Sequence, residues 1–310
     1  MAQHHTVGYL GPAGTFTEEA LLGQADLAAG VLIPFATIPE VLSAVASGEI
    51  SLGFVPMENA IEGTVNATMD GLVFDHDLYI QREVVLDVHL HLMANPGTKL
   101  EQITKVYSYP HALAQVRGFL HDRLPGVEQV AANSTADAAR MLAEHPDPTA
   151  SAIAPKLAAQ LYGLELLATE VEDHLDNQTR FVAVQQGELA PPTGHDRTSI
   201  VCFQKADRPG SLYGILGQFA ARGINLTKLE SRPTRRGLGD YCFVIDLDGH
   251  LSDEVVGDCL AELHANLADV KVLGSYPAAG EDHAQRRVAV AEANAQADGW
   301  LESLRRKVKR

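Results

Sequence analysis

Residues 31–55, VLIPFATIPEVLSAVASGEISLGFV, contain the pattern that decides the fold class. Val31–Phe35 is a short apolar run typical of a strand, and Leu52–Val55 is another. Between them, Thr37 and Glu40 have the spacing of a capping box, which predicts a helix that begins there. A strand, a helix and a strand in this order predict two parallel strands of one sheet.

The same alternation continues on both sides of this unit. Val7–Leu10 indicates a strand, and Gly11–Thr15 indicates a tight loop before a helix, for which Thr15 and Glu18 form a second capping box. A second block is predicted further along, with strands near residues 84–93, 105–108, 129–131 and 151–154 and helices that start near Pro110, Ser134 and Pro155. The chain up to residue 188 is therefore predicted to be α/β with mostly parallel sheets.

The residues after this block indicate a second domain. Residues 189–197 contain two prolines and a glycine and form the predicted linker. Residues 198–277 have the pattern βαββαβ of a ferredoxin-like domain, with strands at 198–203, 225–231, 241–247 and 270–276 and helices at 209–222 and 252–264. Residues 278–310 form a tail, within which Ala284–Arg310 is interpreted as an appended helix.

The composition limits the class of protein. At 310 residues, with 46% hydrophobic and 21% charged residues, the chain is long enough for about two globular domains. No run approaches the roughly 18 apolar residues of a membrane helix, and glycines and Glu18 interrupt the N-terminus where an export signal needs an apolar core. Three cysteines without CxxC spacing suit core positions in a reducing compartment. We therefore expect a cytoplasmic protein with no membrane partner.

The charge distribution limits the partners. A net charge of −16 argues against binding to nucleic acid, which requires clustered Lys and Arg. No Lys or Arg occurs before Arg82, so an anion held by the first 81 residues must be bound by backbone N–H groups, helix N-termini and hydroxyls.

Three motifs that would suggest a cofactor or a metal are incomplete. Gly11–Thr15 lacks the GK[ST] ending of a phosphate loop. His89 and His91 lie on one face of a predicted strand, but no third ligand has convincing spacing. Asp75 and Asp77 fall in a predicted loop between the two blocks. We expect neither a metal nor a cofactor.

Two polar clusters are more informative. Pro56–Val65 follows a parallel-type strand directly, which places Glu58 and Asn59 at the C-terminal end of that strand, where open α/β sheets bind ligands. The stretch HLDNQTRFVAV, residues 174–184, sets a polar run against an apolar strand. By itself such a run is typical of a loop.

Together, motifs in both domains resemble a known family. Gly11–Thr17 (GPAGTFT), Pro56–Asn59 (PMEN) with Glu62–Val65 (EGTV), Ser134–Ala136 (STA) and Asn177–Phe181 (NQTRF) resemble, in this order, prephenate dehydratase. The βαββαβ block is similar to the ACT regulatory domain that follows it in that family, through Arg208–Leu212 (RPGSL), Gly223–Leu226 (GINL) and Glu230–Pro233 (ESRP). The resemblance covers about residues 6–277.

The resemblance implies a lyase of phenylalanine biosynthesis that converts prephenate into phenylpyruvate, with loss of water and carbon dioxide and without a cofactor. It implies a two-lobed catalytic domain like a periplasmic binding protein over residues 1–188. The first lobe would comprise about residues 1–76 and 174–188 and the second about residues 77–173. The substrate would bind between the lobes, and the 174–184 stretch would return the chain across the cleft.

The resemblance also implies the roles of individual residues. Thr179 would donate a hydrogen bond or a proton to the leaving hydroxyl group. The other catalytic candidates are Glu58, Asn59 and Gln115. The candidates for substrate binding are Thr15, Thr64, Ser134, Thr135, Asn177, Arg180 and Phe181. L-Phe is the implied effector, bound between the ACT domains of a homodimer or homotetramer by Pro209, Gly210, Ser211, Leu212, Asn225, Leu226, Glu230, Ser231, Arg232 and Pro233.

Some positions differ from the commoner pattern of the family. Met57 and Ala60 replace a usual Ile and Ser, and Tyr109-Pro-His111 replaces a usual His-Pro-Gln. Two alternatives are a related cyclohexadienyl dehydratase that also accepts arogenate, and a non-catalytic amino-acid-sensing protein built on the same two-lobed fold.

Overall fold

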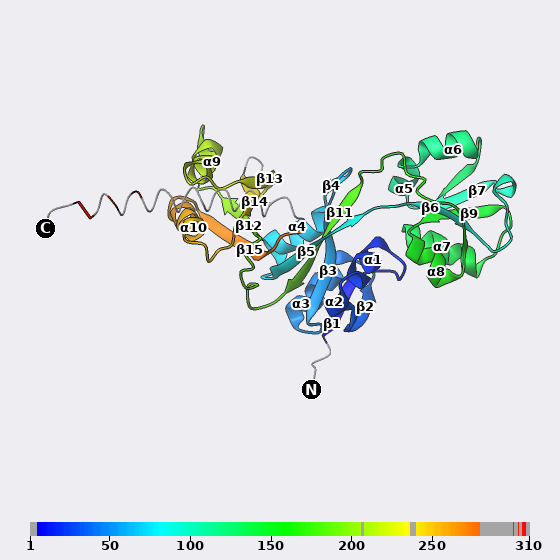
Figure 1. Cartoon of the computed structure of the whole chain (residues 1–310), viewed down its shortest axis with the longest axis horizontal. Coiled ribbons are helices and arrows are strands. Elements are labelled where there is room, and N and C mark those ends of the chain that lie inside the picture. Colours follow the sequence, from blue (N-terminus) through cyan, green and yellow to red (C-terminus); the bar gives the residue numbers. More distant parts are fainter. Residues whose placement is uncertain are drawn as a thin grey trace. The chain divides into compact units, whose positions relative to one another are not determined.

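The computed structural model describes residues 5–205, 208–235 and 240–279, together with Trp300, Ser303, Arg306 and Lys307 (Figure 1). The chain divides into two compact units, of which the first comprises residues 1–78 and 84–186 and the second comprises residues 79–83 and 187–310. Strand β5 (Tyr79–Asp87) therefore contributes residues to both units. The predicted helix over Ala284–Arg310 lies outside the described residues, apart from those last four positions.

The first lobe of the first unit is built around parallel strands. Its elements are β1 (Thr6–Leu10), α1 (Phe16–Leu22), α2 (Ala25–Ala28), β2 (Val31–Phe35), α3 (Ile38–Ser47), β3 (Leu52–Asn59), β4 (Gly63–Thr64), α4 (Asn66–Asp70), the π-helical turn η1 (Gly71–Asp75) and β11 (Gln178–Gln185). Strand β1 pairs in parallel with both β2 and β3, and β11 pairs antiparallel with β3. The parallel unit predicted from residues 31–55 is confirmed.

Helix α3 begins and ends as local sequence predicts. The Thr37 hydroxyl accepts a hydrogen bond from the Glu40 N–H, and the Glu40 carboxylate accepts from the Thr37 N–H, which completes the capping box. Gly48 ends the helix in the left-handed region at φ 77°, where a residue with a side chain would be strained.

The second predicted capping box is only half formed. The Thr15 hydroxyl accepts from the Glu18 N–H, as expected for the cap of α1. The Glu18 carboxylate, however, accepts hydrogen bonds from the Gly14 N–H and the Tyr9 hydroxyl. Burial together with this carboxylate raises the pKa of Tyr9. The prediction of a reciprocal capping box failed because the Glu18 carboxylate is held by Tyr9 of β1, a partner distant in the sequence, and by the Gly14 N–H.

The second lobe is a smaller sheet covered by helices. Its elements are β6 (His91–Ala94), the 3-10 turn η2 (Leu100–Gln102), β7 (Lys105–Ser108), α5 (Pro110–Ala114), α6 (Arg117–Arg123), β8 (Glu128–Ala131), α7 (Thr135–Glu144), β9 (Ala150–Ala154), α8 (Lys156–Tyr162) and β10 (Glu165–Ala168). The strand order is β10-β6-β9-β7-β8, with β7 parallel to β8 and β9 and with β6 and β10 antiparallel to their neighbours. Strand β10 was not predicted.

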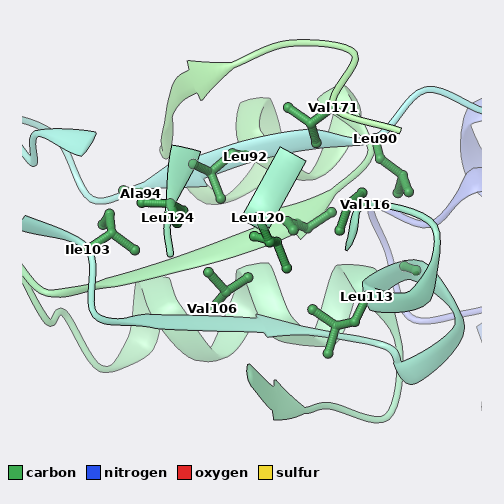
Figure 2. Close-up of a cluster of buried hydrophobic side chains, with 12 residues drawn as sticks. Leu90, Leu92, Ala94, Ile103, Val106, Leu113, Val116, Leu120, Leu124 and Val171 are labelled. Atoms are coloured by element: carbon green, nitrogen blue, oxygen red, sulfur yellow. The ribbon is translucent and has the colours of Figure 1, made fainter. Parts of the chain in front are cut away.

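Apolar side chains from several elements of the second lobe form one core. Leu92 of β6, Val106 of β7 and Leu120 of α6 are buried and point toward one another (Figure 2). Truncating a leucine at such a site to alanine typically costs about 2–5 kcal/mol. This core holds α5 and α6 against the sheet.

The two lobes are joined by two segments of chain. The predicted strand over residues 84–93 is interrupted, because β5 ends at Asp87 and β6 begins at His91. Residues 169–177 lead back from β10 to β11. Two α/β lobes joined in this way form the predicted architecture of a periplasmic binding protein.

The second unit confirms the βαββαβ order. Its elements are β12 (Asp196–Phe203), α9 (Ser211–Ala221), β13 (Leu226–Pro233), β14 (Tyr241–Asp248), α10 (Glu254–Asn266) and β15 (Asp269–Pro277). The antiparallel sheet has the order β13-β14-β12-β15, and both helices pack on it through Ile215, Phe219, Val256 and Leu263. Gly274 of β15 pairs with Ile80, and an added Cβ would lie 2.6 Å from the Ile80 carbonyl oxygen.

Strand β12 begins inside the predicted linker. Asp196 is buried, and its carboxylate accepts hydrogen bonds from the N–H groups of Thr193 and Gly194. Arg197 is also buried, and its Nη1 lies 2.7 Å from Glu83 Oε2. These contacts draw the last two residues of the predicted linker into the sheet.

The cysteines are free and buried, as expected for core positions. Burial raises the pKa of the Cys202 thiol to about 12, so the reactive thiolate is disfavoured. Among the helices of the described residues, none has the length and apolar character needed to cross a bilayer.

Candidate active site

A cavity of about 840 Å³ lies within the first unit and is lined by both lobes. The first lobe contributes residues that follow β1 and β2, such as Pro12 and Ala36, and the end of β3 at Asn59. The second lobe contributes α5 and the start of α7. The cavity thus occupies the C-terminal ends of parallel strands, where open α/β sheets bind their ligands.

Thr179 enters this cavity from β11. Its register partner on β3 is Asn59, and the Asn59 Nδ2 group donates a hydrogen bond of 2.9 Å to Thr179 Oγ1. The orientation of the Asn59 amide is set by its Oδ1, which accepts from the N–H groups of Ile61 and Glu62. Because the Thr179 oxygen accepts from Asn59, the hydroxyl hydrogen remains available as a donor to a ligand.

A chain of amide side chains connects Thr179 to the second lobe. Asn59 Nδ2 also donates to Asn177 Oδ1 at 2.9 Å, and Asn177 Nδ2 donates to Gln115 Oε1 at 3.0 Å. Gln115 Nε2 in turn donates to Glu62 Oε1 at 3.3 Å. Asn177 is only 1% exposed. The structure therefore brings together four sequence candidates, Thr179, Asn59, Asn177 and Gln115, in one network.

The N-terminus of α7 provides another polar part of the lining. Ser134 is the N-cap, and its Oγ accepts a hydrogen bond of 2.9 Å from the Asp137 N–H. Ser134 and Thr135 both line the cavity. The positive end of the helix dipole therefore faces the cavity at the residues predicted to bind an anion.

Two lining residues that can carry positive charge, Arg140 and His111, were not among the sequence candidates. Arg140 Nη2 lies 2.6 Å from Asp137 Oδ1, and Arg140 Nη1 lies 2.8 Å from Glu144 Oε2. Spacings of three and four residues on a helix are typical of solvated ion pairs, so the sequence contained no signal that Arg140 would line a cavity.

Four sequence candidates lie outside the lining. Side chains alternate between the two faces of a strand, so Arg180 and Glu58 point away when their neighbours Thr179 and Asn59 face the cavity. Arg180 Nη2 lies 3.3 Å from Glu58 Oε2, and Thr64 is the register partner of Glu58. The Thr15 hydroxyl is engaged in capping α1 and donates to the Leu10 carbonyl at 3.2 Å.

Phe181, the last of the predicted binding residues, forms an apolar part of the lining. It lies two residues after Thr179 on β11 and therefore on the same face of the strand. Its ring stacks on Phe54 at a centroid distance of 5.6 Å. The cavity thus joins an apolar wall to polar groups at Thr179 and α7, as a ring with charged substituents would require.

The predicted histidine pair lies at the junction of β5 and β6, with His89 between the strands and His91 at the start of β6. Glu172 Oε1 lies 2.8 Å from His89 Nδ1, and this hydrogen bond raises the pKa of His89. Burial lowers the pKa of His91, whose Nδ1 accepts from the Glu170 N–H. Among the residues that the structure describes, no group of three His, Cys, Asp or Glu side chains is arranged to hold a metal ion.

The effector candidates lie in two places of the second unit. Gly210 is the N-cap of α9 at φ 86°, and Ser211 and Leu212 begin that helix. Asn225 precedes β13, and its Nδ2 donates a hydrogen bond of 2.8 Å to Asp248 Oδ2. On β13 itself, Arg232 Nη1 lies 2.7 Å from Glu230 Oε1.

Comparison with known proteins gives matches over both units. The family model for prephenate dehydratase matches residues 7–188, and the model for the ACT domain matches residues 198–265. The prephenate dehydratase of Mycobacterium marinum is 40% identical over 310 aligned positions, which cover 96% of this chain and 95% of the relative.

Solved structures are similar over nearly the whole chain. The crystal structure of prephenate dehydratase in complex with L-Phe from Arthrobacter aurescens is 40% identical with a TM-score of 0.82, covering 96% of this chain and 99% of that one. A structure described as a novel type of quorum quenching acylase is 30% identical with a TM-score of 0.78, and the match covers 88% of this chain and 98% of that chain.

Proposed function

The chain belongs to the prephenate dehydratase family, and we propose that the reaction takes place in the cavity of the first unit with Thr179 as the hydrogen donor. Members of this family are lyases of phenylalanine biosynthesis. They convert prephenate into phenylpyruvate, with loss of water and carbon dioxide.

The observation that supports this assignment is the hydrogen bond from Asn59 to Thr179. As the ring carboxylate leaves as carbon dioxide, the electrons of the broken carbon–carbon bond enter the ring, and the bond between C4 and its hydroxyl oxygen breaks. The departing hydroxide must gain a proton to leave as water. The Thr179 hydroxyl, with its oxygen already accepting from Asn59, directs its hydrogen to that leaving group, and the proton that it gives up is replaced from solvent water.

The amide network keeps this hydroxyl in place. Asn59 is held by two backbone N–H groups, and Asn177 and Gln115 continue the chain of hydrogen bonds to the second lobe. A donor that is oriented before the substrate arrives needs no rearrangement in the transition state. Asn59 and Gln115 are therefore assigned to positioning of the hydroxyl and the substrate. We assign a structural role to the four candidates outside the lining. Glu58, Arg180 and Thr64 stabilise the pairing of β3 with its neighbouring strands, and Thr15 caps α1.

The substrate carries two carboxylates, and the N-terminus of α7 is suited to one of them. Replacing Ser134 with alanine removes the cap but leaves the helix and its dipole. We expect KM for prephenate to rise by about 3- to 10-fold with little change in kcat, the result for an interaction of roughly 1 kcal/mol made equally with substrate and transition state. Steady-state kinetics measure both constants.

Thr37→Ala is the matched control for this prediction, because Thr37 caps α3 in the same way and lies outside the cavity lining. An unchanged KM in Ser134→Ala, or an equal rise in both variants, would show that the carboxylate is held elsewhere.

Turnover of prephenate by the purified protein tests the proposed reaction directly. The appearance of phenylpyruvate is expected, and arogenate supplied in parallel measures the substrate breadth of a cyclohexadienyl dehydratase. The chain described as a quorum quenching acylase has a similar fold. The fold alone therefore does not identify the reaction, and turnover of prephenate has to be measured. No formation of phenylpyruvate would refute the proposal.

We propose residues 1–188 as the catalytic domain, 189–197 as the linker and 198–277 as the ACT domain, with L-Phe as effector. The Arthrobacter aurescens relative was crystallised with L-Phe, which supports this choice. The N–H groups at the start of α9 are suited to the carboxylate of an amino acid. The effector would bind between the ACT domains of a homodimer or homotetramer and favour a state with a poorer cleft.

The replacement Asn225→Ala tests the effector site in the full-length protein. It removes the hydrogen bond to Asp248 that holds the segment before β13. We expect the concentration of L-Phe needed for half-maximal inhibition to rise by ~10-fold, on the scale of one hydrogen bond, with uninhibited kcat unchanged. The control is Asn266→Ala, which removes an exposed amide from α10 of the same unit. Equal sensitivity of all three proteins to L-Phe would place the effector site elsewhere.

A further inference from the structure

We propose that Glu62 and His111 form a latch across the cavity, which holds the two lobes together and engages a carboxylate that would otherwise repel the substrate. The inference rests on the proposed dehydration of a dianionic substrate in this cavity. It assigns a positioning role to two lining residues, one of which, His111, differs from the commoner pattern of the family.

The two side chains come from different lobes. Glu62 lies between β3 and β4 of the first lobe, and His111 lies in α5 of the second. His111 Nδ1 is 3.0 Å from Glu62 Oε1, and the side chains are 56% and 39% exposed. The same carboxylate oxygen accepts from Gln115 Nε2 at 3.3 Å. Glu62 therefore contacts two residues that are one helical turn apart in the second lobe.

The backbone of Glu62 and the ring of His111 are each held by their own lobe. The Glu62 N–H donates to Asn59 Oδ1 at 3.0 Å, which ties the turn to the end of β3. The His111 ring stacks on Tyr109 with a centroid distance of 5.2 Å and an angle of 11° between the rings. Little side-chain entropy is then lost when the contact forms, which favours an ion pair that would otherwise contribute little at the surface.

The charges around the cavity explain why the pair matters for binding. Asp137 and Arg140 of α7 already pair with each other, with 2.6 Å between Arg140 Nη2 and Asp137 Oδ1. Glu62 is thus the lining carboxylate that His111 engages. Without His111, it would face the carboxylates of prephenate and raise the free energy of the bound state.

A second contact between the lobes has a different character. The Tyr162 hydroxyl donates to the Ala13 carbonyl at 2.9 Å, and a Cβ added at Gly14 would lie 3.2 Å from the Ala158 Cα. This contact combines a side-chain hydrogen bond to backbone with a close approach of the two backbones. The Glu62–His111 pair is exposed and made by side chains, so it is the contact that can open and close as substrate enters and product leaves.

A double-mutant cycle on KM tests the latch in the full-length protein. We expect His111→Ala to raise KM for prephenate by about 5-fold with kcat changed less than about 2-fold, at the upper end of the range for an exposed ion pair. Glu62→Ala should raise KM by ~2- to 3-fold, because it loses the latch but also the repulsive charge. In the Glu62→Ala background, adding His111→Ala should change KM by less than about 1.5-fold. His111→Gln should lie between wild type and His111→Ala, since an amide can still donate to Glu62.

Any other outcome of the cycle contradicts the proposed latch. If His111→Ala raises KM equally with and without Glu62, then His111 contacts the substrate directly. If kcat falls while KM is unchanged, the pair acts on the chemical step. His121→Gln on α6 is the matched control, because His121 is exposed in the same lobe and lies outside the lining. Wild-type protein that forms no phenylpyruvate would refute the proposed function itself, a result that is distinct from a missing coupling in an active enzyme.

Discussion

Replacing Thr179 with alanine is expected to lower kcat for prephenate by ~10²–10⁴, the usual effect of removing a positioned acid. The variant loses the hydroxyl that accepts from Asn59 and that we propose as the hydrogen donor to the leaving group. KM should change little, since the carboxylates of the substrate are held by other groups. Steady-state and single-turnover kinetics of phenylpyruvate formation measure the effect.

The control is Thr179→Ser, which keeps the hydroxyl and loses one methyl group. It should retain at least about a tenth of the wild-type kcat, because the hydrogen donor remains. Thr64→Ala, at a hydroxyl outside the cavity lining, should be close to wild type. A folded Thr179→Ala protein with near-normal kcat would exclude Thr179 as the hydrogen donor.

The largest expected loss of stability concerns the buried pair Glu83 and Arg197 in the second unit. Both are less than 10% exposed, and Arg197 Nη1 lies 2.9 Å and 2.7 Å from the two carboxylate oxygens. Glu83 Oε1 also accepts from the Ala279 N–H. Arg197→Met leaves the carboxylate buried without its cation and should lower the free energy of unfolding by about 3–5 kcal/mol. Urea denaturation followed by circular dichroism measures it.

Two further variants distinguish a buried pair from an exposed one. The double variant Glu83→Leu with Arg197→Met removes both charges and should recover most of the loss, because desolvation of an unpaired ion is the main penalty. Glu144→Gln breaks the exposed pair with Arg140 and should leave the midpoint of urea denaturation close to that of the wild type. A cost below about 1 kcal/mol for Arg197→Met would mean that water reaches Glu83.

The pairing of Asn59 with Thr179 shows how strand geometry divides the predicted site. The family motifs identified both segments and singled out Thr179 as the donor, but Glu58 and Asn59 were both catalytic candidates, and the direction of Arg180 could not be read from the sequence. In the pairing of β3 with β11, Thr179 lies opposite Asn59. Because side chains alternate along a strand, Thr179 and Asn59 face the cavity, whereas Glu58 and Arg180 point to the opposite face of the sheet. Which residue of each pair faces the cavity depends on a register between segments 120 residues apart.

The latch and Arg140 illustrate what motif reasoning missed. His111 was noted only as a departure from the usual family pattern, and Arg140 sits in a helix whose spacing indicates a solvated face. Neither carries a local signal of contact with a ligand. The place of His111 in the cavity lining follows from how α5 packs on the core in Figure 2. That of Arg140 follows from the packing of α7, through Ala138, Ala139 and Leu142, on the other core cluster of the second lobe.

The sequence by itself determined the features that depend on neighbouring residues: the α/β alternation, the capping box of Thr37 and Glu40, the helix end at Gly48, the βαββαβ order and, through motifs, the family. Only the tertiary structure decided the half-formed box at Glu18, the break between β5 and β6, and the network from Thr179 to Gln115. The physical reason is the separation along the sequence of the residues that interact. Caps and periodicity are local interactions within one turn or one strand, whereas Asn59 and Asn177 are 118 residues apart and meet only where β11 returns to pair with β3.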